Sequence, residues 1–143
     1  MRRRMVALLA MVVMAATLVI ASGVALAVTK FGGPGNDILT GTNGPDTLVG
    51  GSGDDTLDGL PGPDQIFGGP GDDFVADGED SGGARDILVG GSGDDTLLPG
   101  QFMPRQDVAN CGTGIDTAFA DRTDIVIGCE RVLFRPPTAA DFQ

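Results

Sequence analysis

A nine-residue motif recurs along the middle of this chain of 143 residues, and its first full copy is Gly32-Gly33-Pro34-Gly35-Asn36-Asp37-Ile38-Leu39-Thr40. A second full copy is Gly90-Gly91-Ser92-Gly93-Asp94-Asp95-Thr96-Leu97-Leu98. Five more copies lie between them, starting at Gly41, Gly50, Gly59, Gly68 and, after an insert at 77–80, Ser81. Every copy has aspartate at its sixth place and an aliphatic residue at its eighth. A short, fixed period of this kind predicts a stack of similar structural units.

Each copy combines a turn with a strand. Glycine at the first, second and fourth places permits the positive φ angles of a tight turn, and the last three residues alternate as in a short strand. Two copies complete one flattened coil, so residues 18 apart should stack at the roughly 4.8 Å spacing of parallel strands. We therefore predict an all-β fold, a right-handed parallel β-roll or β-solenoid. Its core would be the eighth-place residues Leu39, Leu48, Leu57, Ile66, Val75, Leu88 and Leu97.

Stacking would also align the sixth-place aspartates along an edge of the roll. Adjacent carboxylates at this spacing repel each other by about 1 kcal/mol even in water, so a cation is expected between the layers. An ion midway between two layers would lie about 2.4 Å from oxygens on either side, which suits calcium and is long for magnesium. Turn carbonyls can complete its oxygen shell. The predicted ligand is Ca²⁺.

These residues resemble the RTX, or haemolysin-type, calcium-binding repeat with the consensus G-G-x-G-x-D-x-U-x, over roughly half of the chain. The resemblance implies a calcium-loaded β-roll in which the sixth-place aspartates and the turn carbonyls bind the metal. The matching aspartates are Asp37, Asp46, Asp55, Asp64, Asp73, Asp86 and Asp95. The matching turn glycines with the full pattern are Gly33, Gly35, Gly51, Gly53, Gly69, Gly71, Gly91 and Gly93.

The two edges of the predicted roll differ in sequence. Copies that start at Gly32, Gly50, Gly68 and Gly90 keep the Gly-Gly-x-Gly pattern and share one edge. On the other edge the fifth place is Pro45, Pro63 or Arg85, and the second place is Thr42, Leu60 or Gly82. Because an arginine beside a site supplies a competing cation, we expect about three good sites on the first edge and about two weaker ones on the second.

A flexible linker is the alternative interpretation of a tract rich in Gly and Asp. Linkers do not hold aliphatic residues at one fixed phase, which favours the roll when calcium is bound. Without calcium we expect disorder, because burial of seven aliphatic side chains does not offset the conformational entropy of ordering the repeats.

The start of the chain has the features of a secretory signal. Arg2, Arg3 and Arg4 precede an apolar run, and Ala25-Leu26-Ala27 is a small-x-small cleavage site. Cleavage after Ala27 divides the chain into a signal peptide (1–27), a calcium-binding roll (28–100) and a degenerate repeat with a C-terminal cap (101–143), and predicts a secreted, extracellular protein. The alternative is an uncleaved helix that anchors the protein in a membrane, since the apolar stretch is long enough to span one.

Beyond the full copies, the nine-residue phase persists, with Asp107 and Asp116 at the sixth place. Cys111 and Cys129 are the only cysteines and lie one coil apart, which puts their Cα atoms within disulfide range. An exported compartment permits the bond, and we predict a disulfide-closed C-terminal end, with two free buried thiols as the alternative. A zinc site is excluded because histidine is absent.

Composition excludes several classes of function. Without Arg2–Arg4, the nine basic residues fall to six against 20 acidic ones, a net charge of about −14 that disfavours nucleic acid. Absence of His, Trp and Tyr argues against an enzyme. We expect a monomeric calcium-binding structural or interaction module, with an extracellular or cell-surface partner left open.

A surface-adhesion or ice-binding module is the alternative function, because threonines recur at the seventh place in Thr47, Thr56, Thr96 and Thr117. The row is interrupted by Ile38, Gln65, Phe74 and Ile87, which weakens this alternative.

Overall fold

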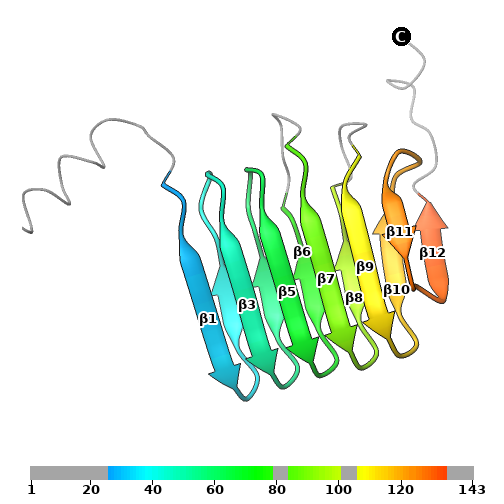
Figure 1. Ribbon diagram of the computed structural model, residues 1–143, viewed down its shortest axis with the longest axis horizontal. Coiled ribbons are helices and arrows are strands. Elements are labelled where there is room, and N and C mark those ends of the chain that lie inside the picture. Colours follow the sequence, from blue (N-terminus) through cyan, green and yellow to red (C-terminus); the bar gives the residue numbers. More distant parts are fainter. Residues whose placement is uncertain (1–25, 79–83, 101–105, 135–143) are drawn as a thin grey trace, which may run out of the picture.

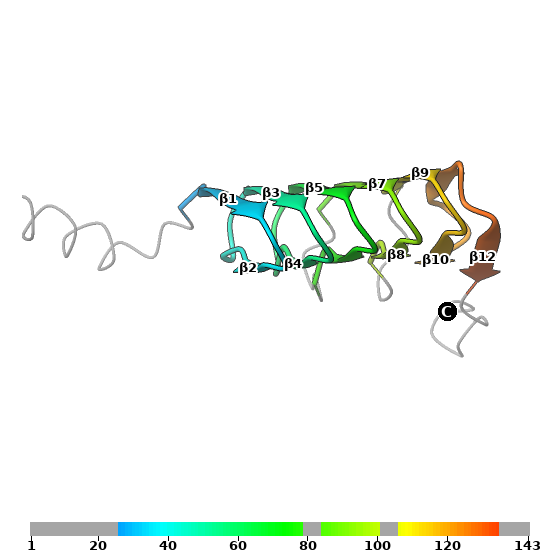
Figure 2. The same ribbon diagram turned by 90° about the horizontal axis from the view of Figure 1, so that it is seen from below.

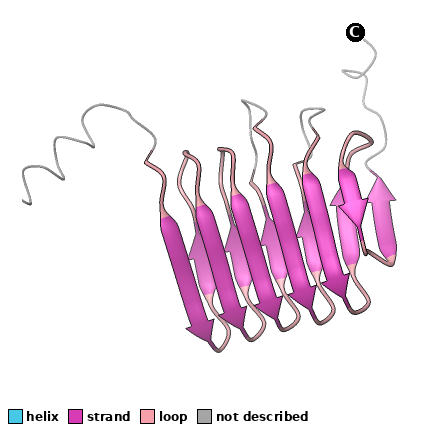
Figure 3. Ribbon diagram, viewed as in Figure 1, coloured by secondary structure: helices cyan, strands magenta, loops and turns pink. Residues whose placement is uncertain are grey.

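The computed structural model describes residues 26–78, 84–100 and 106–134. The predicted secretory signal, or the alternative membrane anchor, occupies residues 1–27, so nearly all of it lies outside these ranges. Within the described ranges, no helix has the length and hydropathy needed to cross a bilayer. The described chain consists of strands and the turns between them (Figure 3).

The described strands alternate along the chain between two parallel sheets (Figures 1 and 2). The first sheet contains β1 (Thr29–Pro34), β3 (Thr47–Ser52), β5 (Gln65–Pro70), β7 (Ile87–Ser92), β9 (Val108–Thr113) and β11 (Ile125–Ile127). The second contains β2 (Ile38–Thr40), β4 (Thr56–Asp58), β6 (Phe74–Ala76), β8 (Thr96–Leu98), β10 (Thr117–Ala120) and β12 (Arg131–Phe134). Each strand pairs with the strand one coil further on, as Leu39 pairs with Leu57 and Leu48 with Ile66. The predicted parallel β-solenoid is confirmed.

Strand length differs between the two sheets. Strands β2, β4, β6 and β8 are the three-residue strands that the repeat predicts. Most strands of the first sheet have six residues, because the two glycines after the triplet continue the ladder. Gly33 pairs with Gly51, and Gly69 with Gly91, before the chain turns.

The core is a single row of aliphatic side chains between the sheets. The eighth-place residues from the second to the seventh copy are fully buried, and Ala109 and Ala118 continue the row in the C-terminal coils. Leu39 belongs to the first layer and is only partly buried, since no earlier coil covers it. The seventh- and ninth-place side chains face outward, so the fold has one thin core and two broad outer faces.

The C-terminal coils extend both sheets past the last full copy of the repeat. Strands β9 and β10 pair with β7 and β8, and β11 and β12 complete the two sheets. Cys111 and Cys129 form the predicted disulfide, with their Cα atoms 5.2 Å apart.

The seventh-place threonines do not form a continuous row in the described structure. Along the outer face of the second sheet, the register places Phe74 between Thr56 and Thr96. Thr47 lies on the other sheet. This arrangement gives no flat threonine ladder and does not favour the ice-binding alternative.

The second-place glycines permit a test of coil stacking. A Cβ added at Gly69 would lie 2.0 Å from the carbonyl oxygen of Gly51, whereas one added at Gly33 in the first layer meets nothing within 4 Å. Both glycines have positive φ, at 125° and 135°. We expect Gly33→Ala to cost about 1–3 kcal/mol from backbone strain alone. Gly69→Ala should be clearly more destabilising in thermal unfolding; equal losses would contradict the stacking.

Candidate metal centre

The regular edge of the roll is formed by the turns that follow β1, β3, β5, β7 and β9, at the arrowheads in Figure 1. These turns stack through direct backbone hydrogen bonds. Gly53 N–H donates to the Pro70 carbonyl at 2.8 Å, and Gly71 N–H donates to the Ser92 carbonyl at 2.8 Å. Because the same turn recurs in each layer, the sixth-place aspartates are held one above another.

These aspartates form an inner ladder with the backbone of the neighbouring layer. The N–H of Asp55 donates to Oδ1 of Asp73 at 2.8 Å, and the N–H of Asp73 donates to Oδ1 of Asp95 at 2.9 Å. The ladder begins at Asp37 and continues from Asp95 to Asp116. Each carboxylate from Asp55 to Asp116 therefore uses one oxygen to hold the coils together.

The second oxygen of these carboxylates is left without a partner. Oδ2 is buried and accepts no hydrogen bond in Asp55, Asp73, Asp95 and Asp116. A buried carboxylate oxygen without a partner is costly and calls for a proton or a cation. The donor set, carboxylate and backbone carbonyl oxygens, is the set that calcium prefers. The residues of the regular edge therefore fit a calcium ion.

Glycine at the first place of the Asp55, Asp73 and Asp95 turns follows from the same geometry. A Cβ at Gly50, Gly68 or Gly90 would lie 2.3 Å from Oδ2 of the sixth-place aspartate in its own turn. The carboxylate folds back over this glycine, so no other residue fits there without moving it.

The electrostatics of the inner ladder favour a bound proton or cation. Burial, followed by the nearby carboxylates Asp73 and Asp116, raises the pKa of Asp95 to about 7. Burial also raises the pKa of Asp73, to which the carboxylates of Asp55 and Asp54 contribute.

An outer ladder of fifth-place residues runs along the exposed rim of the same turns. Asp72 N–H donates to Oδ1 of Asp54 at 3.1 Å, and Asp94 N–H donates to Oδ1 of Asp72 at 2.8 Å. Asp54 N–H donates to the amide oxygen of Asn36 at 3.0 Å. Since an asparagine takes this place in the first layer, the outer ladder does not depend on negative charge.

The irregular edge, formed by the turns that follow the strands of the second sheet, carries its own ladder. Asp46 N–H donates to Asp64, Asp64 to Asp86 and Asp86 to Asp107, at 2.6–2.9 Å. At the first of these turns, Oδ2 of Asp46 is already satisfied by the backbone N–H and the hydroxyl of Thr42. Thr42, which departs from the repeat consensus, thus takes the interactions that a metal would make.

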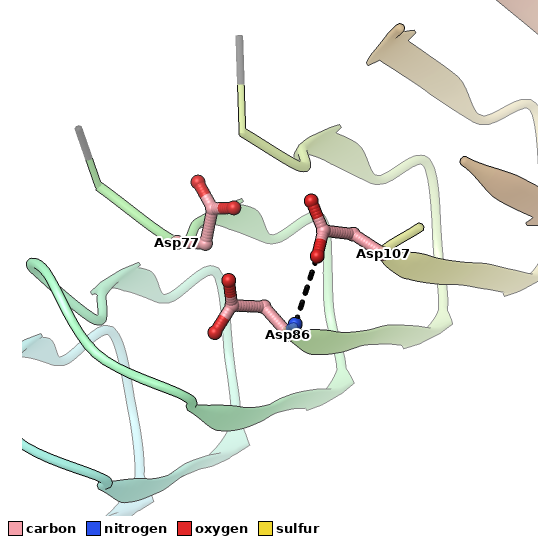
Figure 4. Close-up of side chains that lie close together, drawn as sticks. All are labelled: Asp77, Asp86 and Asp107. Carbon is pink, nitrogen blue, oxygen red and sulfur yellow. Dashed lines mark hydrogen bonds between the residues drawn. The ribbon is translucent and has the colours of Figure 1, made fainter. Parts of the chain in front are cut away.

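Three buried carboxylates of the irregular edge lie together. Oxygens of Asp77, Asp86 and Asp107 are within 4.8 Å of one another, a possible metal-binding group (Figure 4). Asp77 is equivalent to Gly59, the first residue of the corresponding turn one coil earlier. Ala76, which comes before Asp77 in the chain, pairs with Asp58, which comes before Gly59. Its Oδ2 accepts the N–H of Gly100. Burial, together with Asp86 and Asp107, raises the pKa of Asp77 to about 8.

Arg85, which the sequence suggested as a competing cation on this edge, has an exposed side chain. The edge predicted to be weaker also carries Asp77, a carboxylate from the insert.

The structure thus divides the predicted ligands between two edges. Asp37, Asp55, Asp73 and Asp95 lie on the regular edge with all the predicted turn glycines, and Asp46, Asp64 and Asp86 lie on the irregular edge. Five ladder or cluster residues were missing from the predicted set: Asp77, Asp107, Asp116, Asp124 and Glu130. The nine-residue phase could have identified Asp107 and Asp116, but the other three fall outside it.

Comparison with known proteins agrees with this geometry. A family model, the RTX calcium-binding nonapeptide repeat, matches the chain in four copies, over residues 31–66, 49–80 and 80–98. No curated protein and no solved structure gives a significant match.

Proposed function

We propose that the protein is an RTX-type calcium-binding repeat protein, as the family match over residues 31–98 supports, and that calcium ions between the turns of the regular edge hold its coils together in an exported structural or interaction module. The observation that carries this proposal is the row of buried Oδ2 atoms without hydrogen-bond partners in Asp55, Asp73, Asp95 and Asp116. A ligand that supplies positive charge along this row removes the cost of burying it.

The residues that would hold calcium are the inner-ladder aspartates and the carbonyls of the turn glycines. The bound ion supplies positive charge and takes up oxygen ligands. The chain supplies stacked turns whose Gly51, Gly69 and Gly91 have the positive φ angles that this turn requires.

The irregular edge adds one further location. We include the Asp77–Asp86–Asp107 cluster as a calcium site, since one oxygen from each of its three buried carboxylates lies within 4.8 Å of the others, close enough to share one ion. The Asp46 turn should not bind calcium, because Thr42 already satisfies its second carboxylate oxygen.

Export is a separate part of the proposal. It is supported by Arg2–Arg4, the apolar run and Ala25-Leu26-Ala27, and by the disulfide, which persists in an oxidising compartment. An uncleaved membrane anchor would use the same segment. We assign the protein no catalytic role, because the repeat accounts for its carboxylates.

The raised pKa values predict how calcium binding depends on pH. Asp95 and Asp77, with pKa values of about 7 and about 8, hold protons in the folded, calcium-free chain at pH values where an unfolded aspartate is ionised. Calcium must displace these protons, so its affinity should rise between about pH 5 and 8. Because the folded calcium-free chain binds more protons than the unfolded chain, its stability should fall as the pH rises over the same range.

Isothermal titration with CaCl₂ at pH 5.5 and pH 8, in two buffers of different ionisation enthalpy, measures affinity and proton release together. We expect weak sites, about 10⁻⁴ to 10⁻³ M as in extracellular modules, which tighten at the higher pH. Absence of calcium-dependent heat at both pH values would contradict calcium binding.

A further inference from the structure

The inner ladder does not stop where the recognised repeats end. The family match ends at residue 98, yet Asp95 N–H donates to Oδ1 of Asp116 at 2.8 Å, and Asp116 N–H donates to Oε2 of Glu130 at 2.8 Å. Glu130 thus takes the position that an aspartate takes in every earlier layer. It follows Asp116 by only 14 residues, where earlier neighbours in the ladder are 18 to 22 apart.

The turn that contains Asp116 keeps the conformation of the repeat. Gly112 and Gly114 have φ angles of 103° and 151°, like the second- and fourth-place glycines of the earlier turns. Gly93 N–H donates to the carbonyl of Thr113 at 2.9 Å, the hydrogen bond that joins the other stacked turns. Asp116 is completely buried, and its Oδ2 has no hydrogen-bond partner.

The disulfide joins the last two coils, since Cys111 lies in β9 and Cys129 follows β11, which pairs with β9. Cys111 occupies the first place of the Asp116 turn, and Cys129 immediately precedes Glu130. In the turn before, a Cβ at the first place would lie 2.3 Å from Oδ2 of Asp95, so a side chain at this place approaches the sixth-place carboxylate. Cys111 therefore lies beside the carboxylate of Asp116. Its disulfide with Cys129 holds the neighbouring residue Glu130 over Asp116.

The irregular edge ends in a different way. There the final carboxylate is Asp124, whose Oδ1 accepts the N–H of Asp107 at 3.2 Å and whose Oδ2 accepts the N–H of Asp121 at 2.8 Å. Both of its oxygens are occupied by the backbone, so Asp124 terminates its ladder without a ligand.

On the regular edge, by contrast, the side chain of Glu130 is exposed, and only its Oε2 takes part in the described hydrogen bonds.

From this arrangement we infer that Asp116 and Glu130 form a terminal calcium site outside the recognised repeats, and that the Cys111–Cys129 disulfide sets its affinity. The inference rests on calcium binding by the roll, and it adds an acidic ligand and a covalent clamp that the repeat pattern does not contain. Reduction of the disulfide frees Glu130 from its place and removes half of the site, while the interior sites keep their ligands.

Glu130→Gln tests the site without removing the acceptor for Asp116 N–H. In the oxidised full-length protein, equilibrium dialysis should count one calcium ion fewer per chain, or show that ion weakened at least about tenfold. Asp54→Asn is the matched control, because it removes one charge from the exposed outer ladder. In the first layer Asn36 takes the equivalent place and already supplies an amide acceptor. The Asp54→Asn protein should bind as many calcium ions as the wild type. Reduction of wild type should reproduce the Glu130→Gln result.

A second measurement needs no variant. The carboxyl ¹³C resonance of Glu130 should shift on calcium addition in the oxidised protein and stay unchanged in the reduced one. An unchanged resonance in both states, or wild-type ion binding in Glu130→Gln, would overturn the terminal site. If wild type itself binds no calcium, the proposed function fails; if wild type binds and only the Glu130 tests are negative, the terminal site alone fails.

Discussion

In a chelator the protein should lose most of its β-structure and regain it when calcium is added. The hydrophobic core is one row of side chains, mostly Leu, Ile and Val, reduced to alanine in the last coils. Both edges carry buried carboxylates in the interior layers. So small a core does not offset the conformational entropy of ordering the coils together with the cost of burying those charges. The free energy of calcium binding therefore becomes folding free energy.

Far-ultraviolet circular dichroism during a calcium titration measures this transition. We expect a coil-like spectrum in chelator, a cooperative change to a β-rich spectrum near millimolar calcium, and little response to magnesium at the same concentration. The calcium-free spectrum should also become more β-rich near pH 5, because protonation of Asp95 and Asp77 replaces part of the missing positive charge. A β-rich spectrum in chelator at pH 8, unchanged by calcium, would refute the idea.

The sequence predicts the stacked fold well because its period is a direct physical constraint. Aliphatic residues spaced nine apart, such as Leu48 and Leu57, can share one core only if each copy turns the chain half a coil. The pairing of Cys111 with Cys129 follows from the same period and is confirmed.

The period does not reveal how the carboxylates are satisfied. It aligns Asp55 with Asp73 but cannot show that one oxygen of each accepts a backbone N–H while the other has no partner. Asp77 and Glu130 were missed because both lie where the nine-residue phase breaks. Asp77 is the first residue of the insert at 77–80, and a shortened final coil precedes Glu130. Ligand candidates that lie where the repeat is interrupted therefore could not be predicted from the sequence and were identified only in the structure.

Asp73→Asn should raise the calcium midpoint of folding by at least about tenfold, because Asp73 lies between Asp55 and Asp95 and contributes to the layers on both sides. Asparagine keeps the Oδ1 acceptor for the N–H of Asp55. It replaces the partner-free Oδ2 with a donor that repels a cation, and it removes one negative charge. In chelator the same variant should be no less structured than wild type, since a buried carboxyl with a raised pKa has been removed.

Opposite effects in calcium and in chelator distinguish loss of a ligand from general loss of packing, which would destabilise both states. Asp54→Asn provides the matched comparison, since it makes the same chemical change in the neighbouring layer, at the exposed fifth place, where Asn36 already supplies an amide acceptor. Its calcium midpoint should move less than about threefold, as expected for one exposed charge. Similar shifts in the Asp54 and Asp73 variants would mean that calcium responds only to the overall charge of the edge, and the inner ladder would then not be its binding site.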